Sequence, residues 1–434
     1  MFDGGAKAER SQLFHSHPID VTGVCSPAQT PKARHVETSN LSSRWKRNVR
    51  PRVKATRAQQ LSMSFDPGAL AHRAAEPPAQ YDQSETDADE DALGDCQWST
   101  SVALDPKHRP QVWDHPSSTV RREWCRYPQE AHLLDEENWR YRRLTVDEIA
   151  ILQGFEPSWF QIPGMTNRNR IRAIGDAVPP PLARAIVSVI NKQWNWKRRT
   201  AVEICAGSGG LGSGAASLEG MEHLALVDQW APACAILRHE KPWGADRVHC
   251  GNVKQHDFSN LKGKVGFLSG GPPCQPWSIG GRRKGFVDPR DLLAWIHELV
   301  GTLRPEVFAF ENVPGLVTEL NAEYLTSVLS NLRVAGGKKY GVVAGVLNAA
   351  DYGVPQIRRR VIILGFRDMP TAFAHHVFDK IGAAATHRDP HLPAAGRQRW
   401  RTLRDALDAR PDPGGWRKWI DIVPEPRPLG NRRR

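Results

Sequence analysis

Two reactive side chains directly follow short apolar runs in the second half of the sequence. Cys274 lies in the segment Ser269-Gly-Gly-Pro-Pro-Cys-Gln-Pro-Trp-Ser278, and Glu311 opens the segment Glu311-Asn-Val-Pro-Gly315. A cysteine thiolate can attack an electrophilic carbon, and a carboxyl group beside it can hold or move a proton. A lone cysteine is more often a small buried apolar residue, and a lone glutamate often caps a helix or pairs with a cation. The stiff Gly-Gly-Pro-Pro turn suits core packing poorly and therefore favours a nucleophile at Cys274.

A glycine-rich turn in the segment 201–212 precedes both of these side chains. Gly207, Gly209 and Gly210 follow an apolar run, and Asp228 ends the next apolar run. Glycines let backbone amides approach a ligand closely, and a carboxylate at that distance can accept ribose hydroxyl protons. The pattern predicts a nucleoside cofactor. Proteins that bind NAD, FAD or S-adenosylmethionine share it, so the turn by itself leaves the cofactor open.

The elements around these segments alternate between short apolar runs and longer helical patterns. The predicted strands are Val202–Ile204, Leu224–Val227, Val265–Leu268, Val307–Phe310, Gly341–Leu347 and Val361–Gly365. Apolar residues recur at helical spacing within 292–303, and a second helix is expected at Leu182–Ile190. This alternation predicts an α/β fold, a Rossmann-like, doubly wound and mostly parallel sheet. Because parallel strands present their carboxyl ends at one edge, the glycine turn, Cys274 and Glu311 should converge on one cleft.

The bulk properties limit the class of protein. Two domains are expected for 434 residues, and 59 Lys and Arg against 47 Asp and Glu favour a polyanionic partner such as nucleic acid, although a merely basic protein would show the same excess. The seven cysteines are scattered and none is spaced as C-x-x-C, which argues against a disulfide framework and a zinc site. No apolar run approaches the ~20 residues of a membrane helix. We expect a cytoplasmic protein that needs no metal or membrane.

Four motifs in order closely resemble the cytosine-5 DNA methyltransferase family. They are the glycine turn at 201–212, Pro273-Cys274-Gln275, Glu311-Asn-Val, and Gln356-Ile-Arg-Arg-Arg360, which matches Gln-x-Arg-x-Arg. The resemblance implies an S-adenosylmethionine-dependent methyltransferase fold with a smaller DNA-recognition domain. It also implies a DNA (cytosine-5-)-methyltransferase that uses S-adenosyl-L-methionine as cofactor and double-stranded DNA as partner, and we expect a monomer. A tRNA methyltransferase and a non-catalytic DNA-binding regulator on the same scaffold are the alternatives.

The resemblance implies a role for each motif residue. Cys274 adds to carbon 6 of a flipped-out cytosine, Glu311 handles the proton at ring nitrogen 3, Arg358 and Arg360 are cations that assist, and Arg360 contacts the base carbonyl. The implied cofactor-binding residues are Ala206, Gly207, Gly209, Gly210, Leu211, Asp228, Trp230, Asn252, Pro273, Asp176 and Val178. The implied DNA-binding residues are Gln275, Ser278, Arg282, Arg283, Lys284 and Gln356.

Three positions at the expected cofactor site depart from the family pattern. Cys205 replaces an aromatic residue, Asn252 replaces the Asp of Gly-Asp-Val, and Asp176 replaces the Asn of Gly-Asn-Ala-Val. Asn252 can still accept a hydrogen bond from an adenine amino group, and Trp230 can supply the stacking that Cys205 cannot. Cofactor affinity is therefore the property that these departures affect.

The order of the motifs is permuted relative to most of the family. The Arg143-Leu-Thr segment and Gly175-Asp-Ala-Val-Pro179 come before the cofactor turn here, whereas the family has them at its C-terminal end. A circular permutation opens the chain inside the recognition region, so both ends should contribute to it. The expected division is a disordered basic and acidic segment at 1–95, recognition region at 96–165, catalytic domain at 166–370 and further recognition region at 371–434.

Overall fold

The computed structural model describes residues 110–122, 124, 131–138, 140–239, 241–273, 291–393 and 396–418, all in one unit of the fold. The expected disordered segment 1–95 lies outside these residues. So do six of the predicted site residues, which are Cys274, Gln275, Ser278, Arg282, Arg283 and Lys284.

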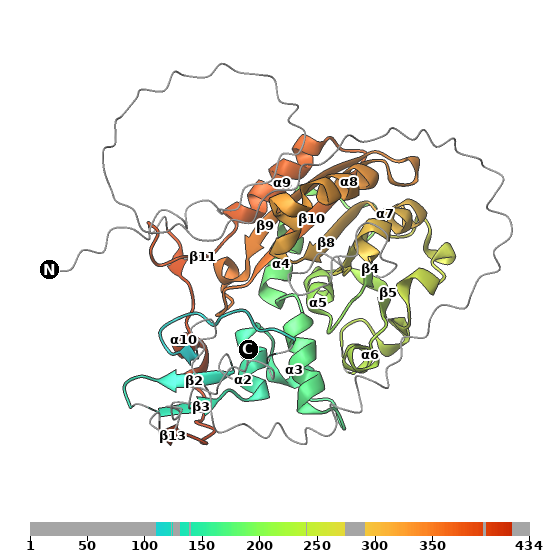
Figure 1. The fold of residues 1–434 in the computed structure, drawn as a ribbon. Coiled ribbons are helices and arrows are strands. Elements are labelled where there is room, and N and C mark those ends of the chain that lie inside the picture. Colours follow the sequence, from blue (N-terminus) through green and yellow to red (C-terminus); the bar gives the residue numbers. More distant parts are fainter. Residues whose placement is uncertain are drawn as a thin grey trace, which may run out of the picture. The chain divides into compact units, whose positions relative to one another are not determined.

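A seven-stranded sheet forms the centre of the fold, in the order β6-β5-β4-β7-β8-β10-β9 (Figure 1). In chain order its strands are β4 (Thr200–Ile204), β5 (Glu222–Asp228), β6 (Val248–Cys250), β7 (Phe267–Gly270), β8 (Val307–Asn312), β9 (Tyr340–Asn348) and β10 (Arg359–Arg367). β10 is antiparallel to both neighbours, and the other paired strands are parallel. The predicted α/β fold is confirmed. The sequence predicts six of these strands. It does not predict β6, because three residues are too few to show a hydrophobic period.

Helices cover both faces of this sheet. One face carries α7 (Leu292–Leu303) and α8 (Ala322–Arg333), and the other carries α4 (Pro180–Gln193), α5 (Gly210–Ala216) and α9 (Thr371–Ala383). Along β8, Phe308 and Phe310 enter the first cluster of buried side chains, whereas Val307 and Ala309 enter the second. This alternation is the two-residue period of a strand buried on both sides. α6 (Ala231–Arg238) packs beside β5 and β6.

The helix α4 is one of the two helices that the sequence predicts. Pro180 and Pro181 occupy its first turn, where a missing N–H costs nothing, and Leu182, Ile186 and Ile190 are fully buried. Together with α3 (Asn167–Asp176) it forms the one stretch among the described residues that is long and apolar enough to cross a membrane. Since 72% of that window is buried within the protein, core packing accounts for its composition.

A smaller unit combines segments from far apart in the sequence. We define the composite module as residues 111–176 together with 403–418. Its sheet has the order β1-β2-β3-β13, so a C-terminal strand completes an N-terminal sheet, and Figure 1 shows the two segments side by side. Its elements are β1 (Gln111–Val112), β2 (His132–Asp135), β3 (Arg140–Arg143), α2 (Val146–Leu152), α3, α10 (Leu403–Leu407) and β13 (Arg417–Lys418).

The contacts between the two halves of the composite module are specific. Leu403 and Leu407 are buried in the same cluster as Trp124 and Leu133. Arg404 donates from Nε and Nη2 to the two carboxylate oxygens of Asp114, at 2.8 and 3.1 Å. The two halves of the composite module are thus joined by both apolar and ionic contacts.

Trp416 closes the C-terminal edge of the composite module. The guanidinium carbons of Arg140 and Arg142 lie 4.2 and 5.0 Å from its ring centroid, and its indole N–H donates to Asp412 at 2.7 Å. Arg142 in turn pairs with Glu148 at 2.6 Å, and Glu148 also completes the capping box of α2 with Thr145. Trp416 therefore covers a buried ion pair.

The remaining elements are short. β11 (His387–Arg388) pairs with β12 (Gln398–Arg399). The single-turn 3-10 helices are Pro157–Phe160, Ala245–Arg247, Val253–Gln255, Ser259–Leu261, Pro314–Val317, Glu319–Asn321, Ala335–Gly337 and Ala349–Tyr352. The helix α9, which the sequence places in the recognition region, packs on β9, where the Phe378 ring lies against Gly345.

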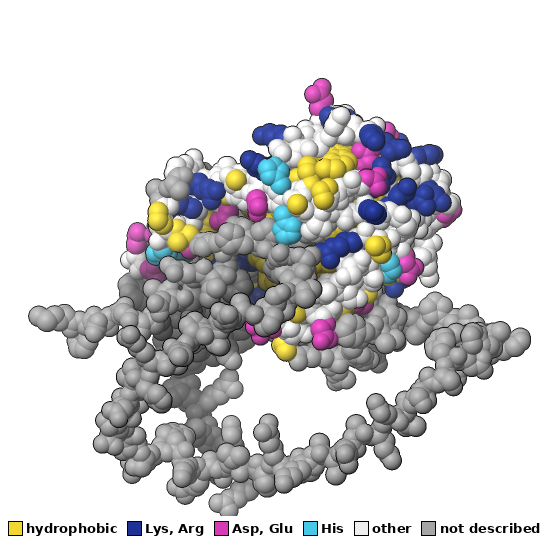
Figure 2. Space-filling view, turned by 90° about the horizontal axis from the view of Figure 1, so that it is seen from above, with side chains coloured by type: hydrophobic (Ala, Val, Ile, Leu, Met, Phe, Trp, Pro, Cys, Tyr) yellow, Lys and Arg dark blue, Asp and Glu magenta, His cyan; other side chains and the backbone are white. Residues whose placement is uncertain are grey.

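One face of the molecule carries a mixture of basic and acidic side chains. On the face seen in Figure 2, from the side of α8 and α9, Lys and Arg side chains form several groups with Asp and Glu among them. The described residues of this face make no continuous basic strip.

Candidate active site

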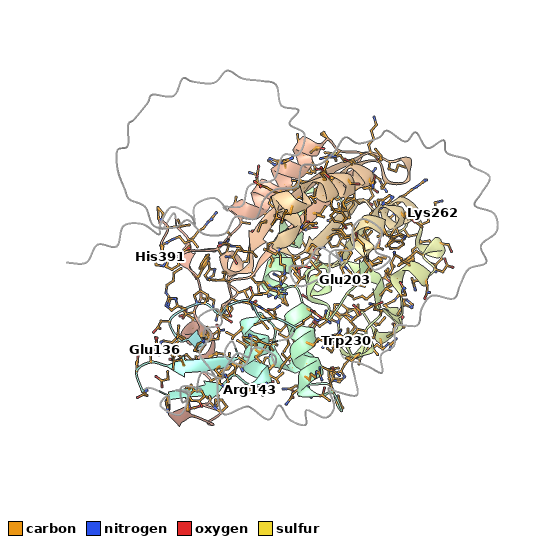
Figure 3. The ribbon with its side chains drawn as sticks, in the orientation of Figure 1. Glu136, Arg143, Glu203, Trp230, Lys262 and His391 are labelled. Atoms are coloured by element: carbon orange, nitrogen blue, oxygen red, sulfur yellow. The ribbon has the colours of Figure 1, made fainter. Side chains whose placement is uncertain are left out.

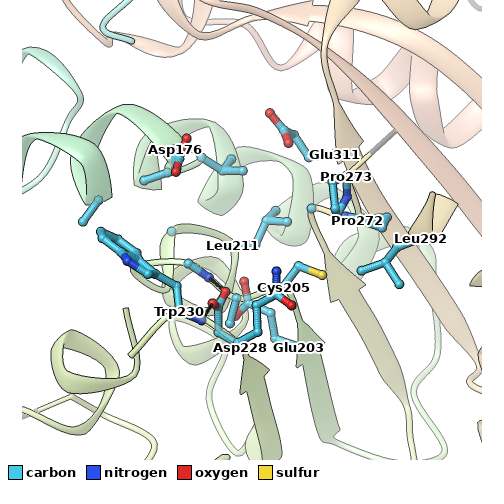
Figure 4. Close-up of a pocket in the computed structure, with 18 of the residues that line it drawn as sticks. Asp176, Glu203, Cys205, Leu211, Asp228, Trp230, Pro272, Pro273, Leu292 and Glu311 are labelled. Atoms are coloured by element: carbon cyan, nitrogen blue, oxygen red, sulfur yellow. Dashed lines mark hydrogen bonds between the residues drawn. The ribbon is translucent and has the colours of Figure 1, made fainter. Parts of the chain in front are cut away.

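A cavity of about 380 Å³ opens at the carboxyl ends of the central strands. The strand order reverses between β4 and β7, which is where open α/β sheets bind ligands. Its lining comes from the turns after β4, β5, β7 and β8 and from the end of α3 (Figure 4). The cavity thus joins residues of the central sheet to residues that precede it in the chain.

The glycine turn after β4 is held by the carboxylate that ends β5. The N–H groups of Gly207 and Trp230 donate to Asp228 at 2.8 Å each. Gly207 has φ +54°, and a side chain at Gly210 would meet the Val178 carbonyl oxygen at 2.0 Å. Burial, with a smaller effect of Asp176, raises the pKa of Asp228. Each Asp228 oxygen keeps a further lone pair for a ligand hydroxyl.

An aromatic ring and an amide stand beside this carboxylate. Trp230 and Asn252 both line the cavity, and the guanidinium carbon of Arg172 lies 4.4 Å from the Trp230 ring centroid. The Asn252 carbonyl oxygen accepts the Lys254 N–H at 2.9 Å. Figure 3 shows Trp230 beside α3, which carries Arg172. One cavity thus offers an aromatic ring that can stack on a base, an acceptor for ribose hydroxyl groups and an amide that can bind the edge of the base, which together suit an adenosine.

Two residues at the end of β4, Glu203 and Cys205, also line this cavity. Glu203 is 2% exposed and packs against Gly212, where an added side chain would lie 2.3 Å from Oε2 of Glu203. Burial, with Asp228 as a second cause, raises the pKa of Glu203 to about 8. Cys205 has a positive φ of 47°, and burial likewise raises the pKa of its thiol. Both groups are therefore protonated at neutral pH.

Glu311 and Arg360 form an ion pair at the other side of the cavity. Nε of Arg360 lies 2.7 Å from Oε1 of Glu311, and these side chains are only 12% and 13% exposed. The pair follows from the antiparallel register of β8 and β10, because Ile362 is opposite Glu311 and Arg360 lies two residues along on the same face. The carboxylate is thus oriented by a cation while it remains accessible from the cavity.

The turn that leads to Cys274 is tied to the strand that carries Glu311. Nδ2 of Asn312 donates to the Pro272 carbonyl at 2.9 Å, and Leu292 N–H donates to the Pro273 carbonyl at 3.2 Å. Gly271, Pro272 and Pro273 consequently line the cavity together with Glu311. The three residues of Glu311-Asn-Val thus line the cavity, and Asn312 also holds the turn before the predicted nucleophile.

Arg358 holds the backbone around the cavity. It is 1% exposed, and its terminal nitrogens donate to the carbonyl oxygens of Val120, Gly175 and Ala177 at 2.9, 2.9 and 3.0 Å. Burial lowers the pKa of Arg358, while the carbonyl oxygens favour its charged form. The sequence predicts a cation that assists the thiol, but both terminal nitrogens of this guanidinium are engaged by the backbone.

Two further predicted site residues occupy structural positions instead. Gln356, predicted to contact DNA, is fully buried, accepts the Val120 N–H at 3.0 Å and donates to Gln153 at 2.7 Å, so it cannot reach a ligand in this conformation. Gly209 does not line the cavity. It precedes α5 with φ +80°, and a side chain there would meet the Trp243 ring at 2.5 Å. Its role is to let the turn form.

The cavity also includes residues that the sequence analysis did not single out. They are Arg122, Arg172, Glu203, Gln229, Val253 and Leu292, among others. A charged residue inside the apolar run of β4 could have drawn attention to Glu203. Arg122 lies far before the cofactor turn in the sequence and in no motif, so only the fold brings it to the cavity.

The model of the family described as C-5 cytosine-specific DNA methylase matches residues 37–192 and 200–413. The chain belongs to this family. Membership implies a methyl donor, and the cavity has the groups to hold one that carries a nucleoside, since Asp228, Trp230 and Asn252 converge on it. Its volume lies within the usual range for ligand sites.

Individual relatives agree with this assignment over part of their length. The chain is 37% identical over 169 residues to the type II methyltransferase M.NaeI of Lentzea aerocolonigenes, covering 38% of this chain and 40% of that protein. It is 38% identical over 168 residues to the type II methyltransferase M.PspPI of a Psychrobacter species, covering 38% and 39%. The matches therefore span about two fifths of these relatives.

A solved structure with partial similarity is the methyltransferase EhMeth of Entamoeba histolytica. It is 21% identical, the match covers 40% of this chain and 54% of that one, and the TM-score is 0.31. A superposition at this level adds nothing to the fold described above.

Proposed function

We propose that this chain is a DNA (cytosine-5-)-methyltransferase that transfers the methyl group of S-adenosyl-L-methionine to carbon 5 of cytosine in duplex DNA. The observation that supports this most is one cavity with two sides. One side has the Glu311–Arg360 pair next to Pro273, and the other has Asp228 and Trp230. A proton-handling group and a nucleoside site thus lie within reach of one bound cofactor.

In the proposed reaction, the Cys274 thiolate forms a bond to carbon 6 of the cytosine. Glu311 supplies the proton at ring nitrogen 3, and Arg360 orients Glu311 and contacts the base carbonyl oxygen. The bound cofactor would provide an electrophilic methyl group; carbon 5 donates its electron pair to it, the bond between the methyl carbon and the cofactor sulfur breaks, and S-adenosylhomocysteine is left. Transfer of the carbon 5 proton to solvent, cleavage of the bond between carbon 6 and Cys274, and return of the ring nitrogen 3 proton to Glu311 restore the ring, the thiolate and the carboxyl group. A stacked base cannot enter this arrangement, so the cytosine is flipped out.

We further propose that the composite module reads the target sequence. It joins both ends of the described chain, as a circular permutation within the recognition region requires, and it carries Gly175 and Asp176 to the cavity. Arg282, Arg283 and Lys284 follow Cys274 in the sequence and would contact phosphates, together with Gln275 and Ser278. We propose a cytoplasmic monomer, and relatives named type II methyltransferases make a restriction-modification setting the first to examine.

Duplex DNA containing fluorocytosine tests the proposed chemistry. Fluorine at carbon 5 cannot leave as a cation, so the wild-type chain with S-adenosyl-L-methionine should form an adduct that survives denaturation. Cys274→Ala should form none, whereas Cys250→Ala, which removes an exposed cysteine, should behave as wild type. An adduct that persists in Cys274→Ala assigns the nucleophile elsewhere. Adduct formation with fluorocytosine-containing tRNA and not with DNA would overturn the proposed substrate.

A further inference from the structure

Four guanidinium groups line the cavity, and three of them are engaged by other protein groups. Arg358 binds three backbone carbonyls, Arg360 pairs with Glu311 at 2.7 Å, and Arg172 lies over the Trp230 ring. Arg122 differs from these. Its side chain is 45% exposed, and its Nε lies 3.8 Å from Oδ2 of Asp176, which is beyond hydrogen-bond distance.

Asp176 is the complementary group. Its side chain is 40% exposed and lines the same cavity, and Figure 4 shows it on the side between Trp230 and Glu311. Its electrostatic neighbours include Arg122 and Arg360, and it is close enough to Asp228 to raise the pKa of that carboxyl. Asp176 therefore lies between the groups suited to adenosine and the groups suited to the target base. Both partners of the loose pair keep hydrogen-bonding capacity that faces the cavity.

We propose that Arg122 and Asp176 together bind the zwitterionic amino-acid end of the cofactor. The Arg122 guanidinium takes the ligand carboxylate, and the Asp176 carboxylate takes the ligand ammonium group. This inference rests on the proposed cofactor. Arg122 and Asp176 lie 3.8 Å apart, so a zwitterion can enter between them with its carboxylate toward Arg122 and its ammonium group toward Asp176. Two charge-assisted hydrogen bonds to the ligand then replace one loose contact between the two side chains.

The balance of charge makes Arg122 necessary. Asp176 occupies a position where the family has a neutral asparagine, and its negative charge would repel a ligand carboxylate. A guanidinium beside it removes this repulsion and can bind a carboxylate with two parallel hydrogen bonds. Arg122 is two residues from Val120, whose carbonyl accepts from Arg358, so the backbone that carries it is anchored to the rim of the cavity.

Binding of two ligands to purified full-length variants tests this inference without any turnover. S-adenosylhomocysteine has the amino-acid end, and methylthioadenosine has the same nucleoside without it. Arg122→Gln should weaken S-adenosylhomocysteine binding by about tenfold or more in calorimetry and leave methylthioadenosine binding unchanged. Arg121→Gln is the matched control, because it removes the neighbouring charge from a side chain that does not line the cavity.

The pair is tested by adding Asp176→Asn. This change removes the group that takes the ligand ammonium, so the loss of S-adenosylhomocysteine affinity in the double variant should be smaller than the sum of the two single losses, because both groups bind one zwitterion. Equal affinity of wild type and Arg122→Gln for S-adenosylhomocysteine would overturn the inference while the proposed cofactor stands. An equal loss for both ligands would also overturn it, since Arg122 would then support the fold. No binding of either ligand to wild type and Arg121→Gln would refute the proposed cofactor instead.

Discussion

At the scale of single residues, a substitution at Glu311 can test proton transfer without disturbing the shape of the Glu311–Arg360 pair. Glu311→Gln keeps the shape and the oxygen that faces Nε of Arg360 at 2.7 Å but removes the titratable group. We expect methyl transfer to fall by about 100-fold or more, while S-adenosylhomocysteine binding and the thermal unfolding temperature change little. Glu319→Gln makes the same chemical change at an exposed position and should have no effect. Wild-type turnover of Glu311→Gln would remove this carboxyl from the mechanism.

The buried carboxyl of Glu203 should make the stability of the ligand-free protein depend on pH. Its pKa rises from 4.5 to about 8 on folding, mainly because of burial. Between these values the unfolded chain has lost this proton and the folded chain keeps it, so folding stability decreases as pH rises, by up to about 1.4 kcal/mol per pH unit. The contribution of Glu203 to folding stability is fully present below pH 4.5 and is lost as the pH rises to about 8.

Urea denaturation of wild type and Glu203→Gln at several pH values measures this contribution. The variant cannot ionise, so its stability relative to wild type should increase from about pH 5 to about pH 8. Glu219→Gln, on the exposed turn before β5, controls for the loss of one negative charge in the unfolded chain. Parallel curves for wild type and Glu203→Gln would show that Glu203 is ionised in the folded protein.

At the scale of elements, Arg358 joins the start of β10 to two segments that precede β4. Arg358→Met fills much of the same volume but leaves the carbonyls of Val120 and Gly175 without this donor. We expect a loss of about 3 kcal/mol or more in unfolding free energy, together with weaker S-adenosylhomocysteine binding. Arg359→Met, at the exposed neighbouring position, should change neither quantity. An unchanged stability with reduced turnover would instead favour the catalytic role that the motif predicts for Arg358.

At the scale of the whole molecule, the proposed permutation makes a prediction about chain order. β1 and β13 are opposite edges of the sheet of the composite module, three strand spacings or about 15 Å apart. A chain that starts at Trp194, continues to residue 434 and is joined there to residues 98–193 has ample length to span this gap through 419–434 and 98–109. This reordered chain should fold, and its S-adenosylhomocysteine affinity should remain within about threefold of wild type. Failure to bind after reordering, with the original order binding normally, would contradict the proposal.

Local patterns were sufficient for six of the seven strands of the large sheet. Short apolar runs ending in glycine or proline turns predict six of its strands, because strands buried on both faces are continuous in hydrophobicity. The three residues of β6 carry too little pattern to be found. The short strands of the composite module are equally hidden, and β13 pairs with β3 only because chain segments hundreds of residues apart meet.

The sequence by itself determined the residue types at the site, because Asp228, Pro273 and Glu311 end or follow the parallel strands β5, β7 and β8, and the carboxyl ends of parallel strands meet at one edge of a sheet. Only the tertiary structure decided what each arginine and glutamine does. Arg358, Gln356 and Arg360 lie within five residues of one another, yet only Arg360 pairs with Glu311, and the other two are buried on backbone and side-chain partners from segments before β4. Arg122 reaches the cavity through the same long-range packing. Burial and partners depend on the whole fold, and no local pattern encodes them.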